Sequence, residues 1–301
     1  MTAEEKTMSK IIKKTAAIHD LSGFGRASLT TVIPILSTMG VQVCPVPTAV
    51  LSTQTSGFED YSFLDLTDYM EQHIAHWKKL NLNFDCIYSG FLGSVRQIKI
   101  VSDFVDYFGT KDNIVVVDPV LGDDGELYGT MENDMIREMK KLIGKADIIT
   151  PNFTEAAFLL NKQYKEVITE KEIKEWLREL ADLGPKIVII TSVPDEKKEP
   201  EDKKINVIAF DKENDQFWKV SCSYIPASYP GTGDAYTSVV IGSIMQGDSL
   251  PAAIDKGVQF ITNCIKTSYE FDYPHREGVL LEKNLSLLNT SGFISSYELL
   301  K

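Results

Sequence analysis

The chain has 301 residues, of which 43% are hydrophobic and 25% charged, which is enough apolar material for one large or two modest globular domains. Its formal net charge of −12 argues against nucleic acid and an anionic membrane surface as partners, although a local basic pocket can still bind nucleotide phosphates. The composition therefore favours a folded protein that acts on small polar ligands.

Cysteine spacing and hydropathy indicate where such a protein works. The cysteines are far apart, form no CxxC pair and sit mostly in apolar surroundings, as is typical of reduced, buried thiols. No apolar run approaches the roughly 18 residues of a membrane span, and the polar start MTAEEKTMSKIIKK lacks a signal-peptide core. We expect a cytoplasmic protein with a flexible tail over residues 1–9 and a single domain over residues 10–301.

Short apolar runs alternate with longer amphipathic segments from the start of the chain, as a doubly wound sheet requires. A strand is expected over residues 11–20, followed by a helix over 28–39 that Gly40 closes. Prolines in the extended stretch 41–52 indicate an irregular or edge strand, and a helix is expected over 67–80.

Four further apolar strands each lead into a polar or glycine-containing turn, at residues 84–93, 113–122, 146–152 and 186–192. Helical stretches such as IREMKKLIG separate them. Ligands of open parallel sheets bind beyond the carboxyl ends of the strands, so polar side chains at these ends are expected to converge on one rim. These side chains are Asp20, Ser89, Asp118, Asn152 and Thr191.

The pattern changes beyond Thr191. Residues 204–211 and 216–226 are expected to form antiparallel strands, and a long helix is expected over residues 251–269. The charged stretch 194–204 has too little apolar content to be buried and is interpreted as a solvated loop.

Gly231, Thr232, Gly233 and Asp234 open an apolar helical run near the end of the chain. Glycines let backbone amides turn toward a ligand, and a helix start presents unpaired N–H groups that can hold a phosphate. A carboxylate beside a phosphate is repelled unless it has a task such as taking a proton from an attacking hydroxyl, so the tetrapeptide suggests phosphoryl transfer. The alternative is an ordinary helix start in which Asp234 complements the helix dipole. Neither a GxxxxGK[ST] loop nor a GxGxxG fingerprint is present.

Two acidic segments follow predicted strands. Asn152 and Glu155 lie in IITPNFTE, and Asp118 and Asp123 lie in VDPVLGDDG. Their oxygens can hold Mg²⁺ directly or through water. Structural interpretations stay open at each position, because Asp118 and Asp123 suit turns and Glu155 suits a helix cap.

Together, GTGD, VDPVLGDDG and ITPNFTEA resemble, in order and spacing, the ribokinase-like superfamily and, within it, the vitamin B6 (pyridoxal) kinases. The likeness spans nearly the entire chain. SGFLGS at residues 89–94 resembles the SGYLGS-type segment of that family, HDLSGFGRAS at 19–28 resembles its first strand and substrate turn, and TQTSGF at 53–58 stands in the place of another substrate-lining segment.

This resemblance implies an α/β fold, ribokinase-like, with a central mostly parallel sheet and helices on both faces in three layers. It implies an ATP- and Mg²⁺-dependent kinase that phosphorylates the 5′-hydroxymethyl group of pyridoxal, and also pyridoxine and pyridoxamine, and that forms a homodimer. A role for a monovalent cation stays open.

The resemblance also implies roles for individual residues. Asp234 is the base that accepts the alcohol proton, and the residues Gly231–Gly233 form an anion hole for the transferred phosphoryl group. Phe91 stacks on the pyridine ring, where the family commonly has Tyr, while TQTSGF departs from the more usual His-Thr pair. The remaining assignments are Asp20, Ser22, Thr55, Ser56 and His19 for the vitamin; Asp118, Asn152, Thr191, Ser192 and Thr232 for the nucleotide; and Asp118, Asp123, Asn152 and Glu155 for the metal.

Two other functions remain open. One is a related kinase that acts on hydroxymethylpyrimidine, a sugar or a nucleoside, although the pyrimidine kinases frequently show GTGC where this chain has GTGD. The other is a catalytically silent vitamin-binding protein, against which the intact acid, glycine turn and metal-side pair argue.

Overall fold

The computed structural model describes residues 12–129, 131–195, 204–289 and 295–300. The expected tail at residues 1–9 and most of the charged stretch 194–204 lie outside these ranges.

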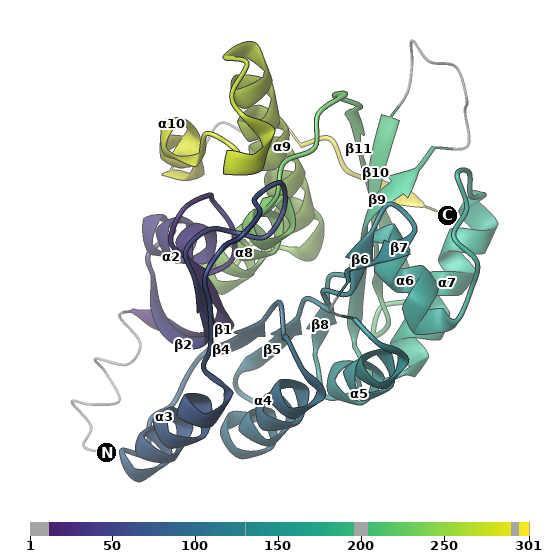
Figure 1. The fold of residues 1–301 in the computed structure, drawn as a ribbon. Coiled ribbons are helices and arrows are strands. Elements are labelled where there is room, and N and C mark those ends of the chain that lie inside the picture. The colour runs from purple at the N-terminus through teal and green to yellow at the C-terminus, as the bar shows by residue number, and fades with distance from the viewer. Residues whose placement is uncertain (1–11, 130, 196–203, 290–294, 301) are drawn as a thin grey trace.

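One large sheet organises the described residues (Figure 1). Its strands are β1 (Lys13–Ser22), β2 (Val41–Leu51), β3 (Phe63–Asp65), β4 (Cys86–Ser89), β5 (Ile114–Val117), β8 (Ile148–Ile149), β9 (Ile187–Pro194), β10 (Lys204–Asp211), β11 (Gln216–Ser223) and β12 (Glu298–Leu300). They lie in the order β12-β11-β10-β9-β8-β5-β4-β1-β2-β3. A separate small hairpin joins β6 (Gly122–Asp123) and β7 (Glu126–Leu127).

The strands from β2 to β9 across the centre of the sheet pair in parallel, whereas β9, β10, β11 and β12 pair antiparallel. The predicted change after Thr191 is therefore confirmed. The prolines of β2 also lie where they were expected: Pro45 and Pro47 pair with β1 on one side only, because β3 joins β2 from Ala49 onward among the described residues.

Helices cover both faces of the sheet (Figure 1). One face carries α2 (Leu29–Thr38), α8 (Thr232–Gln246) and α9 (Leu250–Glu270), and the other carries α3 (Thr67–Lys79), α4 (Val95–Phe108), α5 (Asn133–Ile143), α6 (Phe153–Leu160) and α7 (Glu170–Asp182). Short pieces η2 (His275–Glu277), α10 (Leu281–Asn284) and η3 (Leu285–Asn289) follow α9. The predicted three-layer α/β/α fold is confirmed.

Two apolar cores separate these layers. The first, which includes Phe104, Phe153 and Trp176, packs α3 to α7 against the sheet, and the second, which includes Tyr236 and Ile254, packs α2, α8 and α9 against its opposite face. A strand buried on both sides must be apolar throughout, which is why the parallel strands read as continuous apolar runs. No helix in the described part of the chain combines the length and hydropathy that crossing a bilayer requires.

Candidate active site

The start of α8 is built around a close backbone contact. Gly231, its N-cap residue, has a φ of 79°, and a Cβ atom there would lie 2.1 Å from the backbone oxygen of Arg26. Only glycine fits both restrictions. The helix start has no side-chain cap, because its N-cap residue is a glycine, and the hydroxyl of the next residue, Thr232, donates to the Tyr229 carbonyl at 3.1 Å. The first N–H groups of α8 are thus left without the side-chain acceptor that most helix starts have, as an anion site requires.

Asp234 is held by the turn that begins α2. Its Oδ2 atom accepts a hydrogen bond from the Ser28 backbone N–H at 2.8 Å, and its Oδ1 atom lies 3.6 Å from His19 Nδ1. The Ser28 hydroxyl donates to Asp20 at 2.5 Å, and the Ser22 hydroxyl donates to the same carboxylate at 3.2 Å. Burial, and then the charge of Asp234, raise the pKa of Asp20. The Asp234 side chain keeps 14% of its surface exposed, so it is oriented but still accessible.

His19 lies beneath this carboxylate. Its ring is fully buried and packs edge-on against Tyr88, with 4.3 Å between the ring centroids. A Cβ atom on Gly90 would lie 2.3 Å from two atoms of the ring, so the glycine of the SGFLGS segment makes room for the histidine. The structure therefore places His19 against Asp234 rather than on an open vitamin-binding surface.

Asp118 faces the glycine turn from the end of β5. It is buried, and a Cβ atom on Gly233 would lie 3.9 Å from its Oδ2 atom. Burial, followed by the charges of Glu155 and Asp234, raises the pKa of Asp118 well above its usual range. Burial also raises the pKa of Glu155 to about 8, and the charge of Asp123 adds to the shift. The predicted acids thus form one electrostatically coupled group beside the start of α8.

Asn152 and Glu155 form a capping box at the start of α6. The Asn152 Oδ1 atom accepts from the Glu155 N–H at 2.8 Å, and the Glu155 Oε2 atom accepts from the Asn152 N–H at 2.7 Å. Glu155 Oε1 also accepts from the Leu121 N–H at 3.1 Å, and the Asn152 amide donates to the Gly122 carbonyl at 2.8 Å. The helix-cap interpretation of Glu155 is confirmed, and these bonds occupy the oxygens that direct metal ligation by this pair needs.

No group of three or more His, Cys, Asp or Glu side chains is arranged to hold a metal ion in the stretches that the structure describes. Asp123 is exposed and accepts from the Asp124 N–H at 3.0 Å. Mg²⁺ commonly binds through one or two carboxylates together with water and phosphate oxygens rather than in an all-protein cage. This acidic group has the composition of the protein side of such a site.

Thr191 lies next to the α6 start, as the rim prediction required. Its N–H donates to the Pro151 carbonyl at 3.0 Å, and it forms a β-bridge with Asn152. Ser192 follows with an exposed side chain and a φ of 56°. A contact absent from the sequence prediction joins the Thr237 and Thr150 hydroxyls at 3.0 Å and fixes the second turn of α8 to the end of β8.

The proposed vitamin-binding residues are spread around the β1 and β2 ends. Thr55 and Ser56 are exposed, and Phe91 is half-buried and packs against the core under α3 and α4. The buried Gln54 organises this loop: its Oε1 atom accepts from the Ser56 N–H at 2.5 Å, and its Nε2 atom donates to the Arg276 carbonyl at 2.6 Å. The contact between Gln54 and Arg276 was not predicted, since no local motif links residues so far apart in the sequence.

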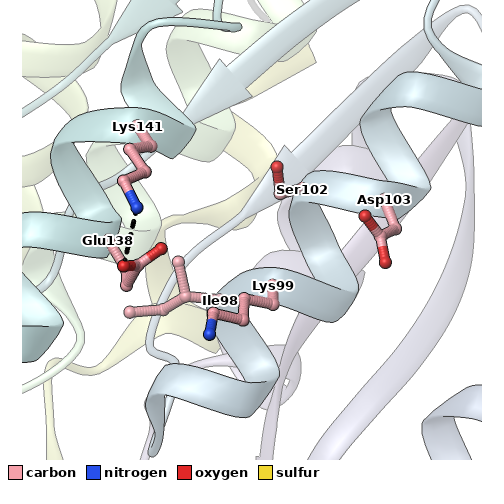
Figure 2. Close-up of a pocket in the computed structure, with 6 residues that line it drawn as sticks. All are labelled: Ile98, Lys99, Ser102, Asp103, Glu138 and Lys141. Carbon is pink, nitrogen blue, oxygen red and sulfur yellow. Dashed lines mark hydrogen bonds and ion pairs between the residues drawn. The ribbon is translucent and has the colours of Figure 1, made fainter.

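Two hollows lie away from this rim. One, of about 70 Å³, lies between α4 and α5, where Lys141 bonds to Glu138 at 2.8 Å (Figure 2). The other, of about 300 Å³, lies at the C-terminal ends of α2 and α8, opposite the Gly231 end. The polar convergence at the strand ends, rather than either hollow, defines the candidate active site.

A three-layer fold with an uncapped glycine helix start and an acid held beside it is the arrangement of the ribokinase-like superfamily of small-molecule kinases. The family model for phosphomethylpyrimidine kinase matches residues 25–278. The chain belongs to this family, and within the superfamily it is a member of the pyridoxal kinase family.

Similar proteins from several organisms are named as phosphomethylpyrimidine kinases or as pyridoxal kinases. A provisionally named phosphomethylpyrimidine kinase from Bacteroides thetaiotaomicron, crystallised with pyridoxal, is 55% identical, with a TM-score of 0.92 over 96% of this chain and 100% of that one. Pyridoxal kinase from Lactobacillus plantarum is 30% identical, with a TM-score of 0.83 over 92% and 96% of the two chains. Pyridoxal kinase from Dictyostelium discoideum is 26% identical over 250 residues, which are 78% of this chain and 79% of the relative.

Proposed function

We propose that this protein is an ATP-dependent kinase that phosphorylates the 5′-hydroxymethyl group of pyridoxal, and of pyridoxine and pyridoxamine, to give the 5′-phosphates. The observation that carries this proposal is the placement of the Asp234 carboxylate beside the uncapped start of α8. The Bacteroides relative that was crystallised with pyridoxal supports the substrate.

The chemistry follows from what these groups can do. The Asp234 carboxylate takes the proton of the alcohol while the alcohol oxygen attacks the terminal phosphorus of ATP, and ADP leaves with the electrons of the broken P–O bond. The N–H groups that follow Gly231 stabilise the charge on the transferred phosphoryl group. The Ser28 N–H fixes Oδ2 of Asp234, and Oδ1, which lies 3.6 Å from His19 Nδ1, would accept the proton of the alcohol.

A divalent cation suits the acidic group. Its donors are oxygens. Burial, together with the charges of Glu155 and Asp234, raises the pKa of Asp118, and a bound cation would favour the charged form of this carboxyl. Asp118 and Asp123 would hold Mg²⁺, and Asn152 and Glu155 would act through water, since their own oxygens serve the α6 cap. When bound, Mg²⁺ would neutralise part of the nucleotide phosphate charge.

The other contacts are assigned by position. Thr191, Ser192 and Thr232 would face the nucleotide with Asp118 and Asn152, and Phe91 would cover the vitamin ring. Asp20, Ser22, Thr55 and Ser56 would shape the polar side of the vitamin site. We further propose that the enzyme is a cytoplasmic homodimer.

Hydroxymethylpyrimidine phosphorylation is the second candidate, because the matching family and the Bacteroides relative are named as phosphomethylpyrimidine kinases, which act on a related pyrimidine. A panel of pyridoxal, pyridoxine, pyridoxamine and hydroxymethylpyrimidine, each supplied with ATP and Mg²⁺, separates the two by the kcat/KM of product formation. Pyridoxal is expected to give the higher value. A higher value for hydroxymethylpyrimidine would reverse the substrate assignment, and absence of any product would favour a vitamin-binding protein without activity.

A further inference from the structure

The turn of residues 25–28 contacts two distant parts of the chain, the start of α8 and the segment that follows α9. The Arg26 N–H donates to the Glu277 carbonyl at 3.0 Å. The Arg26 carbonyl oxygen lies close to two glycines of positive φ, Gly231 and Gly278. A Cβ atom added to Gly231 would lie 2.1 Å from this oxygen, and one added to Gly278 would lie 2.8 Å from it. The peptide of Arg26 therefore touches both the catalytic helix start and the segment that follows α9.

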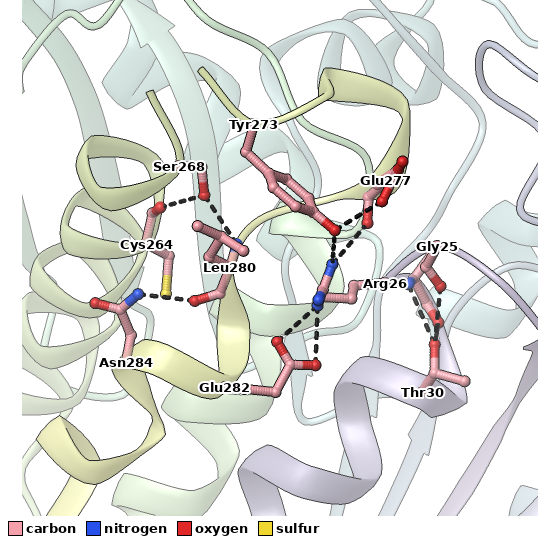
Figure 3. A network of polar contacts seen from close by, with 11 residues as sticks. Gly25, Arg26, Thr30, Cys264, Ser268, Tyr273, Glu277, Leu280, Glu282 and Asn284 are labelled. Atoms are coloured by element: carbon pink, nitrogen blue, oxygen red, sulfur yellow. Dashed lines mark hydrogen bonds and ion pairs between the residues drawn. The ribbon is translucent and has the colours of Figure 1, made fainter. Parts of the chain in front are cut away.

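The Arg26 side chain strengthens this connection (Figure 3). Its Nε atom donates to both carboxylate oxygens of Glu282, at 2.8 and 3.0 Å. Its Nη1 atom donates to the Tyr273 hydroxyl at 3.1 Å and to the Glu277 carbonyl at 3.2 Å, and the Tyr273 hydroxyl donates to the Glu277 carboxylate at 2.7 Å. A lone exposed ion pair contributes little, but a guanidinium tied at several points fixes geometry. We call residues 273–282 the closing segment.

Ser28, two residues after Arg26, orients Asp234, the proposed base. Ser28 donates its N–H to Asp234 and its hydroxyl to Asp20. Its backbone has a φ of 51° and a ψ of −132°, which side chains with a Cβ atom rarely adopt. Such a conformation persists only where the surrounding structure holds it. The contacts of Arg26 with the closing segment and with the start of α8 supply that restraint from one side of the turn.

We infer that Arg26 is a positioning residue, which acts through Ser28 to keep the Asp234 carboxylate aimed at the substrate alcohol; this inference rests on the proposed function. Arg26 makes no chemical contribution of its own in this scheme. It joins the closing segment to the turn, so a change in that segment reaches the base through the backbone of residues 25–28.

Steady-state kinetics of Arg26→Gln test the inference. The variant is expected to lose about tenfold in kcat, with the KM values for pyridoxal and ATP within about twofold of wild type, because orientation and not binding is impaired. The kcat of Arg26→Lys should lie between those of wild type and Arg26→Gln, since one ammonium group cannot donate to Glu282 and Tyr273 in the same geometry. Arg96→Gln is the matched control, because Arg96 also pairs with two carboxylates but lies on α4.

Glu282→Gln distinguishes positioning from direct contact. If Arg26 acts through the closing segment, this variant also lowers kcat, and the double variant with Arg26→Gln is no slower than Arg26→Gln alone. An unchanged kcat in Arg26→Gln, a loss confined to KM, or a full kcat for Glu282→Gln beside a slow Arg26→Gln would each overturn the inference.

Amide hydrogen exchange tests the same restraint without turnover. Arg26→Gln should speed exchange of the Ser28 N–H, which donates to Asp234, and Arg96→Gln should not. If wild type phosphorylates no member of the substrate panel, the proposed function fails while this measurement still judges the restraint. Unchanged exchange at Ser28 would overturn it.

Discussion

Helices α6 and α8 begin at the same rim of the sheet, and both carry an acid at the third helical position, yet the two acids are used differently. Glu155 folds back on the α6 backbone and completes a capping box. Asp234 turns away from its own helix to the Ser28 N–H, and Gly231 leaves α8 without a side-chain cap. A cap typically contributes about 1 kcal/mol to stability. The chain thus stabilises one helix start and leaves the other available for a ligand.

The strongest test of this comparison removes the acid of α8. Asp234→Ala is expected to lower kcat about a thousandfold, because the alcohol loses its proton acceptor, while ATP still binds. Kinetics and calorimetric titration with ATP measure the two effects. Asp248→Asn, which changes an acid just beyond the other end of α8, is the control and should retain activity. A turnover of Asp234→Ala close to wild type would remove Asp234 from catalysis.

The glycine at the α8 start gives the next largest effect. Gly231→Ala is expected to lower kcat about a hundredfold, because its Cβ atom would push the Arg26 carbonyl and displace the N–H groups of the helix start. Gly247→Ala separates this clash from backbone strain, since Gly247 also has a positive φ but has nothing within 4 Å of a Cβ atom. Equal losses of activity and thermal stability in the two variants would contradict the account.

At the capped start of α6, replacement of Glu155 is expected to change stability rather than activity. Glu155→Gln loses one acceptor for the backbone N–H groups of Asn152 and Leu121, at an expected cost of about 1–2 kcal/mol in the free energy of unfolding. Denaturant unfolding at acidic pH, below the pKa that Glu155 has in the unfolded chain, where Glu155 is protonated in both the folded and the unfolded state, measures this cost. An unchanged midpoint would show that the capping box contributes nothing.

The pH dependence of that stability has a definite sign. Because the pKa of Glu155 is about 8 in the folded protein and lower in the unfolded chain, the folded state holds a proton that the unfolded state has lost. The resulting stabilisation is complete below the unfolded pKa and disappears as pH rises through about 8. Ligand-free wild type should therefore melt at a lower temperature at alkaline than at mildly acidic pH, and Glu155→Gln should reduce this difference. Equal slopes in the two proteins would contradict the shift.

Phe91 is expected to give the smallest effect. Phe91→Ala should raise the KM for pyridoxal a few-fold with little change in the KM for ATP, because a ring stacked on the vitamin contributes about 1 kcal/mol. Its packing against the core also predicts a modest loss of thermal stability. A lower melting temperature with an unchanged KM for pyridoxal would remove Phe91 from the substrate site.

Much of this molecule could be predicted from its sequence, because the informative patterns are local. The apolar runs of β4 and β5 reflect the burial of both faces of these strands. The GTGD sequence indicates the start of α8. The capping box was visible as an alternative because its two residues stand three apart.

The remaining features depend on contacts that no local pattern encodes. Ser28 adopts its positive φ within tertiary contacts, and Arg26 meets Glu282 across more than 250 residues of sequence. The buried Gln54 similarly reaches Arg276. His19 carries a polar ring, yet its place under Gly90 shows only when β1 and β4 lie side by side.

A crystal structure with pyridoxal, Mg²⁺ and a non-hydrolysable ATP analogue would show whether the start of α8 binds phosphate beside the proposed base. We expect the terminal phosphate to lie within hydrogen-bonding distance of the N–H groups that open α8, with the 5′-hydroxyl of the vitamin against the Asp234 carboxylate. A terminal phosphate bound elsewhere, or a vitamin hydroxyl directed away from Asp234, would contradict this expectation.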